Sequence, residues 1–253
     1  MHVCIFFCIF APEMLSMKQY KAIFLDWDQT IGDWEGAEYQ ALQDIYAHYR
    51  LSEWYDCFED YLSVYKERNL ELWQLYGEQK VTKEYLHRER FLYPMLKPLG
   101  LDAMPCPPKA MVDLADKIGK EFLALTNVYF RLLPDAEKVV KYLAQKYPLT
   151  IISNGFSEVQ YYKFEHSGLE PYLKHILISE EVGCNKPQPG IFEEALRRNG
   201  VTKDEAIMIG DSYSSDIAGA KAAGIDQIWV TTEETDKDAT YKVTTLAEIM
   251  KIL

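Results

Sequence analysis

The chain has 253 residues, of which 48% are hydrophobic and 26% are charged, and its formal net charge is −12. These values fit a folded globular protein and exclude a disordered chain, a collagen and a long coiled coil. The excess of 39 acidic over 27 basic residues argues against nucleic acid as a main partner, because contacts with a phosphate polymer need basic patches. A small phosphorylated ligand needs only a local positive site and stays compatible with this charge.

The first residues, M-H-V-C-I-F-F-C-I-F, form an unusual apolar start. This run is far shorter than the ~20 residues of a membrane helix, and it lacks the basic start and the cleavage site of a signal peptide. Met17 leads directly into an apolar segment. We therefore interpret residues 1–16 as a leader added by a start codon called too early, with an extra packed segment or a targeting anchor as alternatives. No membrane association is expected.

The cysteines are scattered along the chain, and no C-x-x-C pair occurs. This spacing predicts neither a disulfide framework nor a zinc site, and a reducing cytoplasm is the expected location.

Short apolar runs predict the strands of a parallel sheet. They lie at residues 22–25, 149–152, 175–178, 206–209 and 227–230. Helical patterns at 135–146, 157–167, 189–198 and 214–223 separate the later runs, and several end at a glycine. This alternation predicts an α/β fold, a Rossmann-like doubly wound parallel sheet with helices on both faces.

The interval between the first two strands is different, because it shows helical periodicity and little strand character. We expect helices at 33–49, 53–69, 70–76, 82–92 and 109–126, interrupted by Pro94, Pro98 and the prolines between 105 and 108. We therefore predict an inserted helical domain at residues 33–130, and a sheet domain made of 17–32 and 131–253.

Polar side chains follow the predicted strands where each strand ends. Asp26-Trp27-Asp28-Gln29-Thr30 follows the first strand, and Asp211 with Asp216 follows the fourth. In open α/β sheets ligands bind at the carboxyl ends of the strands, so these groups are expected to converge. Clustered carboxylates repel one another, and a hard cation with oxygen ligands relieves the repulsion. The sequence thus predicts a Mg²⁺ site.

The same edge carries groups that suit a phosphate. Ser153 and Asn154 follow the second strand, and Lys186 follows the third. A metal, a lysine and backbone amides together form a phosphate cradle. An aspartate at a strand end can then act as nucleophile and form an aspartyl-phosphate.

Asp26-x-Asp28-x-Thr30, Ser153, Lys186 and Asp211-x4-Asp216 occur in this order and resemble the four motifs of the haloacid dehalogenase superfamily over residues 20–232. The resemblance implies that Asp26 is the nucleophile and that Asp28 is first general acid and then general base. It also implies that Mg²⁺ is held by the side chains of Asp26 and Asp211 and the backbone carbonyl of Asp28.

The resemblance further implies that Ser153 and Asn154 bind the transferred phosphoryl group and that Lys186 neutralises Asp26 and a phosphate oxygen. Asp216 would orient Lys186 or a metal-bound water, and Thr30 would support the loop of Asp26. The inserted helices resemble the C1 cap of the superfamily, a lid that closes over the site.

Asp28 favours phosphoryl transfer over dehalogenation, because a halide leaves without a proton. A phosphonatase with a lysine such as Lys66 or Lys80, a phosphomutase and a catalytically silent binding protein are the alternatives. Nothing in the surroundings of these lysines singles one out. A mutase keeps the same motifs, whereas a silent protein would usually lose one of these acids.

The inserted segment is rich in aromatic residues, most of which are expected to pack helices. Trp34 follows the nucleophile loop and is the candidate for contact with a flat base. K-A-I-F-L-D-W-D-Q-T-I-G-D-W and the aromatic cap resemble the noncanonical pyrimidine nucleotidase (YjjG-like) subgroup. This resemblance implies a 5'-nucleotidase acting on a nucleoside 5'-monophosphate, with a sugar-phosphate or other metabolite phosphatase as alternative. We expect a monomer or a homodimer.

Overall fold

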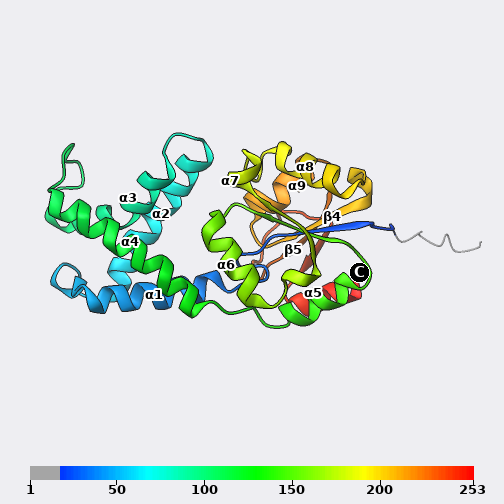
Figure 1. Ribbon diagram of the computed structural model, residues 1–253, viewed down its shortest axis with the longest axis horizontal. Coiled ribbons are helices and arrows are strands. Elements are labelled where there is room, and N and C mark those ends of the chain that lie inside the picture. Colours follow the sequence, from blue (N-terminus) through cyan, green and yellow to red (C-terminus); the bar gives the residue numbers. More distant parts are fainter. Residues whose placement is uncertain (1–17) are drawn as a thin grey trace, which may run out of the picture.

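The computed structural model describes residues 18–253, and the leader expected at residues 1–16 lies outside this range. Helices α1 to α4 form one lobe, called here the helical lobe, and the strands with α5 to α9 form the sheet lobe (Figure 1). Within residues 18–253 no helix has both the length and the apolar character needed to cross a membrane. Cys57, Cys106 and Cys184 are free thiols in this part of the chain.

The sheet is parallel and has the strand order β3-β2-β1-β4-β5-β6. Its strands are β1 (Ala22–Leu25), β2 (Leu149–Ser153), β3 (Leu173–Ile178), β4 (Ala206–Gly210), β5 (Asp226–Val230) and β6 (Tyr241–Val243). The predicted α/β class and the strands at β1 to β5 are confirmed. The short edge strand β6 was not predicted, because two of its three residues are exposed and carry no apolar pattern.

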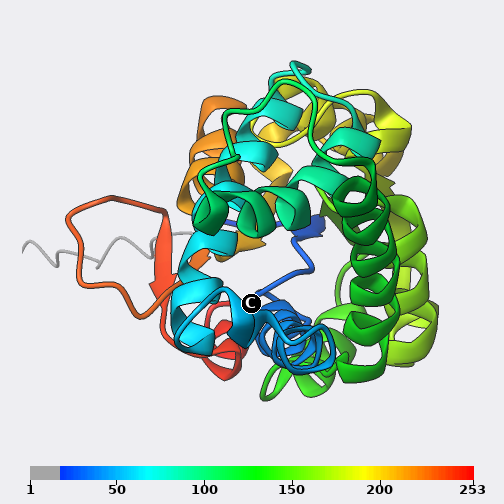
Figure 2. The ribbon, with the colours of Figure 1, turned by 90° about the vertical axis from the view of Figure 1, so that its left-hand side faces the viewer.

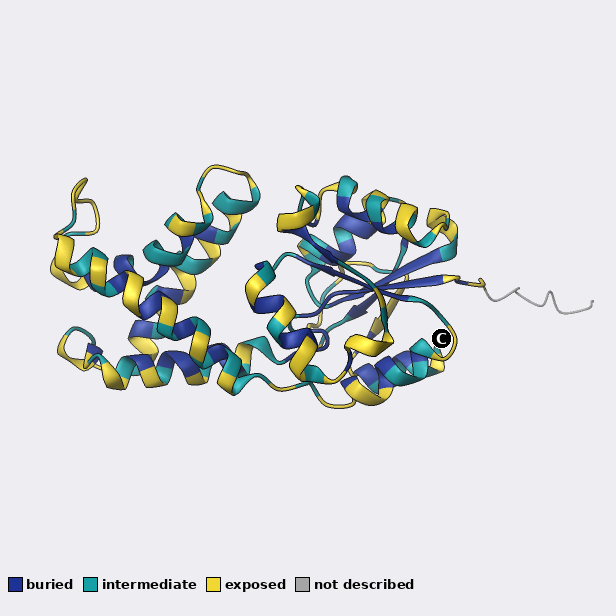
Figure 3. Cartoon of the chain, in the orientation of Figure 1, coloured by how far each residue is buried: buried dark blue, intermediate teal, exposed yellow. Residues whose placement is uncertain are grey.

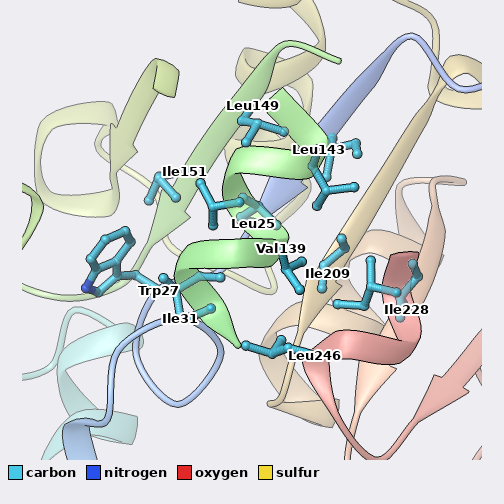
Figure 4. Close-up of a cluster of buried hydrophobic side chains, with 14 of the residues drawn as sticks. Leu25, Trp27, Ile31, Val139, Leu143, Leu149, Ile151, Ile209, Ile228 and Leu246 are labelled. Atoms are coloured by element: carbon cyan, nitrogen blue, oxygen red, sulfur yellow. The ribbon is translucent and has the colours of Figure 1, made fainter. Parts of the chain in front are cut away.

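Successive residues of β1 face opposite sides of the sheet, as strand geometry requires. Ile23 and Leu25 pack with α5, α6 and the C-terminal turn at Leu246–Lys251, and Figure 4 shows part of this cluster. Ala22 and Phe24 pack on the other face with α8 and α9. Both faces of the sheet are thus covered at its centre, which explains why β1 and β4 are continuous apolar runs.

The sheet lobe contains α5 (Ala136–Ala144), α6 (Ser157–Ser167), α7 (Ser179–Val182), α8 (Pro189–Asn199) and α9 (Ala218–Ala222). The predicted end of α6 before Gly168 is confirmed, because that glycine has φ 69°. The helix expected at 214–223 is instead a π-helical turn, Tyr213–Ile217, followed by the short α9.

The helical lobe consists of α1 (Trp34–His48), α2 (Phe58–Gly77), α3 (Lys83–Leu96) and α4 (Lys109–Tyr129). It has a buried core of its own, to which all of these helices contribute (Figures 2 and 3). The break expected between residues 69 and 70 is wrong, since α2 is continuous and begins only at Phe58. Pro94 does not end α3, which continues for two residues to Leu96.

The chain passes between the lobes twice, and the two passages lie side by side. Asp33 N donates to Arg131 O at 2.9 Å, and Leu133 N donates to Ile31 O at 2.9 Å. Gln29 adopts φ 61°, and its side-chain Oε1 accepts a hydrogen bond from Glu35 N at 2.8 Å. Gln29 thus joins the loop after β1 to the start of α1. The domain boundaries at 33 and 130 stay a prediction.

Candidate functional site

A cavity of about 840 Å³ lies between the carboxyl ends of the strands and the helical lobe. Its volume lies within the range of roughly 300–1,000 Å³ typical of small-molecule sites. On the sheet side it is lined by Asp26, Asp28, Ser153, Asn154, Lys186, Asp211 and Asp216, and on the helical side by Trp34, Trp73, Tyr76, Arg90 and Leu123. The structure therefore brings together the predicted site residues except Thr30, which lies behind them.

Lys186 is the centre of a buried charge cluster. Its ammonium Nζ bonds to Asp26 Oδ1, and it contacts Asp216 Oδ1 at 2.7 Å. The side chains of Lys186 and Asp216 are only 2% and 1% exposed. Asp216 Oδ2 accepts a hydrogen bond from Ser212 N at 3.1 Å, so both of its oxygens are engaged. Asp216 is thus placed to hold Lys186 against Asp26.

Asp211 follows β4, which is the neighbour of β1 in the sheet. Thr30 is completely buried, and its hydroxyl donates to Asp211 Oδ1 at 2.9 Å. Trp229 Nε1 donates to the backbone carbonyl of Asp211 at 2.7 Å. The hydroxyl of Thr30 thus holds the side chain of Asp211, and the expected support of the Asp26 loop by Thr30 stays a prediction.

The carboxylates of this cluster compete for positive charge. Burial raises the pKa of the Asp26 carboxyl well above its usual range, against the effect of Lys186. Burial and the charge of Asp216 raise the pKa of Asp211 to about 6. Burial disfavours the charged Lys186, but Asp216 and Asp26 together raise its pKa above the usual value. Three carboxylates thus face one ammonium group, and the cluster lacks positive charge.

The donor set fits a hard divalent cation. Asp26, Asp211 and Asp216 each have a carboxylate oxygen within 4.8 Å of the others. Asp26 Oδ2 and Asp211 Oδ2 accept no hydrogen bond from another residue of the described chain, and neither does the carbonyl oxygen of Asp28. Oxygen-only ligands of this kind suit Mg²⁺. The oxygens left free are those named for the metal in the sequence prediction.

Ser153 and Asn154 make contacts that organise the loops around Lys186. Asn154 Oδ1 accepts from Lys186 N at 2.8 Å, and Asn154 Nδ2 donates to Lys186 O at 2.9 Å. The Asn154 side chain thus clamps the backbone of Lys186. Ser153, which is 2% exposed, accepts from Gly155 N at 3.1 Å. Its hydroxyl proton is directed to no other described residue and is available to a ligand.

Asp28 is held by two residues that the sequence analysis missed. Lys163 Nζ donates to Asp28 Oδ1 at 2.6 Å, and Gln160 Nε2 donates to Asp28 Oδ2 at 2.6 Å. The Lys163 side chain is 2% exposed, and its ammonium lies 4.1 Å from the ring centroid of Trp34. A signal for both residues exists. Residues 156, 159, 160, 163 and 164 follow the spacing of an inward helix face, so a lysine and a glutamine stand at buried positions.

Aromatic rings line the helical side of the cavity. Trp73 stacks on Phe156 with ring centroids 4.9 Å apart and an interplanar angle of 25°. Trp34, the predicted candidate for contact with a base, also lines the cavity. Its ring packs edge-to-face against Phe122, with the ring centroids 6.1 Å apart. A flat organic group can pack against such rings, while its phosphate remains at the polar strand ends.

Comparison with known proteins agrees with this geometry. The family model for haloacid dehalogenase-like hydrolases matches residues 23–230. The HAD-hydrolase YfnB of Bacillus subtilis is 29% identical, over 94% of this chain and 97% of that protein. The pyrimidine 5'-nucleotidase YjjG of Escherichia coli is 28% identical, over 91% of this chain and 96% of that protein. A glyceraldehyde 3-phosphate phosphatase of Pyrococcus furiosus is 29% identical over 94% of both chains.

The fold agrees with that of a solved relative. The crystal structure of YfnB with bound magnesium has a TM-score of 0.79 and 28% identity, and it covers 93% of this chain and 99% of its own. That structure reveals an interdomain movement in YfnB. The family match and the shared fold agree with the motifs and with their placement at one edge of the sheet. The chain is a hydrolytic enzyme and belongs to the haloacid dehalogenase-like hydrolases.

Proposed function

We propose that this protein is a Mg²⁺-dependent phosphatase that hydrolyses a nucleoside 5'-monophosphate, with a pyrimidine base, through an aspartyl-phosphate. The main support is a single cavity that is lined by the Asp26–Lys186–Asp216 cluster and also by aromatic rings of the helical lobe. The first set of residues suits a phosphate, and the second set suits a flat organic group. The names of the relatives YjjG and YfnB fit a hydrolase of this kind.

In the first step a carboxylate oxygen of Asp26 attacks phosphorus, the new O–P bond forms, and the bond from phosphorus to the ester oxygen breaks. Asp28 gives its proton to the departing ester oxygen. Lys186, already bonded to Asp26, offsets the negative charge of the phosphoryl group together with donors from Ser153 and the backbone. The products are the aspartyl-phosphate and the free alcohol.

In the second step a water molecule attacks phosphorus and gives a proton to Asp28. The bond between Asp26 and phosphorus breaks, which restores Asp26 and releases inorganic phosphate. In the structure Lys163 and Gln160 each bind one oxygen of the Asp28 carboxylate, which orients the group that gives and then receives the proton.

Asp26, Asp211 and the backbone carbonyl of Asp28 would hold Mg²⁺. When bound, the ion would neutralise the phosphate oxygens and the carboxylates around them. The cytoplasmic location and the monomeric or homodimeric state stay predictions.

The proposal is tested by a substrate panel with purified protein and Mg²⁺. Uridine 5'-monophosphate, ribose 5-phosphate, glyceraldehyde 3-phosphate and p-nitrophenyl phosphate are compared by kcat/KM for phosphate release. We expect the highest value for uridine 5'-monophosphate. Preference for either sugar phosphate by a wide margin would contradict the nucleotidase assignment, and no phosphate release from any of them would contradict the phosphatase assignment.

The alternative of a sugar-phosphate phosphatase is favoured by one finding, the glyceraldehyde 3-phosphate phosphatase among the relatives. A phosphomutase would transfer the phosphoryl group back to a second hydroxyl rather than to water. Release of inorganic phosphate in equal amount to the alcohol distinguishes the hydrolase from the mutase.

A further inference from the structure

Arg90 of α3 is a buried cation at the helical side of the cavity. The residue is 2% exposed and lines the cavity that also contains Asp26. Its guanidinium lies 4.7 Å from the ring centroid of Phe122 and 5.3 Å from that of Phe91. A charged group in such surroundings is costly unless hydrogen-bond partners satisfy its N–H groups.

The partners of Arg90 within the described chain are incomplete. Its Nη2 donates to His87 Nδ1 at 2.9 Å, since a guanidinium has only donors. Its Nε is buried and has no hydrogen-bond partner. Among residues 18–253 no carboxylate oxygen comes within 4.0 Å of the guanidinium. Its Nη1 donates to no residue of the described chain either and, unlike Nε, is not enclosed by the atoms around it, so Nη1 is the donor that a molecule in the cavity can use.

The charge around Arg90 favours a neutral acceptor over an anion. Glu38, which is 6% exposed, lies close enough for Arg90 to lower its pKa against the larger effect of burial. An anionic ligand group beside Arg90 and Glu38 would leave one uncompensated negative charge in a buried site, which costs free energy. A carbonyl oxygen accepts the free N–H and adds no net charge.

The placement of the two ends of the cavity indicates which part of the substrate reaches Arg90. The phosphate-binding groups stand at the strand ends of the sheet lobe, whereas Arg90 comes from α3 of the helical lobe. A phosphomonoester bound at Asp26 therefore directs its organic part toward the side where Arg90 and the aromatic rings Trp34 and Trp73 lie.

We propose that Arg90 determines substrate specificity by donating a hydrogen bond to a carbonyl oxygen of a flat ring in the organic part of the substrate. The inference rests on the proposed nucleotidase function, because it assumes that the phosphate of the substrate lies at Asp26. A pyrimidine base carries such a carbonyl, whereas a sugar phosphate without a base does not.

The test compares kcat/KM for uridine 5'-monophosphate, ribose 5-phosphate and phosphoglycolate in the wild type and in Arg90→Met. Loss of a hydrogen bond from a charged donor is expected to lower the value for uridine 5'-monophosphate about 10- to 100-fold more than the value for ribose 5-phosphate. Arg90→Lys retains the positive charge but loses the planar set of N–H donors of the guanidinium. We expect its loss of kcat/KM for uridine 5'-monophosphate, relative to ribose 5-phosphate, to lie between those of the wild type and Arg90→Met.

A matched control is Arg68→Met, in the same lobe. Arg68 also has a buried Nε without a partner and packs on an aromatic ring, that of Tyr93 at 5.0 Å, but it does not line the cavity. We expect this variant to keep the wild-type ratio between the substrates. Arg90→Met removes the cation that acts most strongly on the buried Glu38 and leaves only the weaker effect of Lys66. The double variant E38Q/R90M is therefore measured as well, with its Tm, to separate loss of folding from loss of selectivity.

Equal losses on uridine 5'-monophosphate and ribose 5-phosphate in the folded variants would overturn the role of Arg90 while leaving the nucleotidase proposal intact. A larger loss on phosphoglycolate than on uridine 5'-monophosphate would overturn the carbonyl in favour of a carboxylate. A wild type that does not prefer uridine 5'-monophosphate to ribose 5-phosphate would contradict the nucleotidase proposal itself, and the inference with it.

Discussion

Asp28 and Lys163 form an ion pair at 2.6 Å in which the lysine is almost completely buried. Burial of an ammonium group is costly unless a group of opposite charge pairs with it, and the Asp28 carboxylate is this partner. The carboxylate is fixed from two sides, because Gln160 binds its other oxygen. We infer that Lys163 is a positioning residue, which sets where the Asp28 carboxylate stands relative to Asp26.

Replacing Lys163 with methionine tests this inference. Met keeps most of the side-chain volume but frees Asp28 from its ion pair, so we expect kcat to fall by about 10- to 100-fold, part of the 10²–10⁴-fold that general acid–base catalysis contributes. KM should change much less, since the phosphate contacts remain. Steady-state kinetics with uridine 5'-monophosphate measure both values.

The control for this variant is Lys141→Met on the surface of α5, where the lysine pairs with exposed Glu137. It should leave kcat unchanged, because exposed pairs of this kind contribute little. A wild-type kcat in Lys163→Met would show that Asp28 does not need its partner.

The sequence predicts Asp26 and Asp211 as site residues because each follows an apolar strand directly. Asp26 and Asp211 are one residue beyond β1 and β4, and strand ends converge whatever the rest of the chain does. Lys163 and Arg90 stand within helices, where a lone basic residue is usually solvated. Whether these two residues are buried depends on how α6 and α3 pack against the rest of the molecule. The only local signal for this is the stripe of apolar residues on the same helix face.

At the scale of elements, the turn after β4 supports the site through one glycine. A Cβ built on Gly210 would stand 2.4 Å from Asp216 Oδ2, which is closer than real Cβ atoms come to a neighbour. Asp216 can therefore approach the backbone of β4 and hold Lys186 only because residue 210 has no side chain. The π-helical turn Tyr213–Ile217 carries Asp216 to this place.

Gly210→Ala is thus expected to displace Asp216 and with it Lys186. Overpacking of a buried site costs about 1–3 kcal/mol of folding stability, and kcat should fall at least 10-fold because the charge opposite Asp26 moves. Urea unfolding and the rate of phosphate release measure the two effects. Unchanged stability and unchanged kcat would contradict the tight contact between Gly210 and Asp216.

The same scale shows what limits prediction of the fold. The strands β1 and β4 can be predicted because burial on both faces makes each a continuous apolar run, and β2, β3 and β5 because each contains a shorter apolar run. The sequence prediction divides α2 before Leu70, which the structure places, 74% exposed, within a continuous helix, and it ends α3 early because Pro94 normally ends a helix. Packing against neighbouring helices stabilises α2 and α3 as continuous helices across Leu70 and Pro94. Such contacts between distant segments cannot be read from the sequence near these residues.

At the scale of the whole molecule, the two lobes touch through Phe156 and Lys83. The ring of Phe156, from the loop after β2, packs on Trp73, Tyr76 and His87 of the helical lobe. Lys83 of α3 contacts Glu158 at 2.7 Å and Glu180 at 2.9 Å, both in the sheet lobe. These contacts join the helical lobe to the sheet lobe beside the cavity, which Phe156 also lines.

Phe156→Ala removes an apolar contact between the lobes. We expect a more open molecule, seen as a larger radius of gyration by small-angle X-ray scattering, and a KM for uridine 5'-monophosphate raised about 10-fold. Tyr172→Ala is the control, because Tyr172 is a partly exposed aromatic residue outside the cavity. An unchanged KM and radius of gyration in Phe156→Ala would contradict the closing role of this ring.

In the proposed reaction Asp26 becomes phosphorylated, and Mg²⁺ is required for this step. The most direct measurement is phosphate release from uridine 5'-monophosphate by the wild type and by Asp26→Asn, each with Mg²⁺ and with EDTA. We expect phosphate release only from the wild type in the presence of Mg²⁺. Asp26→Asn should release none, because an amide at position 26 cannot act as the nucleophile. Release by Asp26→Asn at the wild-type rate, or by the wild type in EDTA, would contradict it.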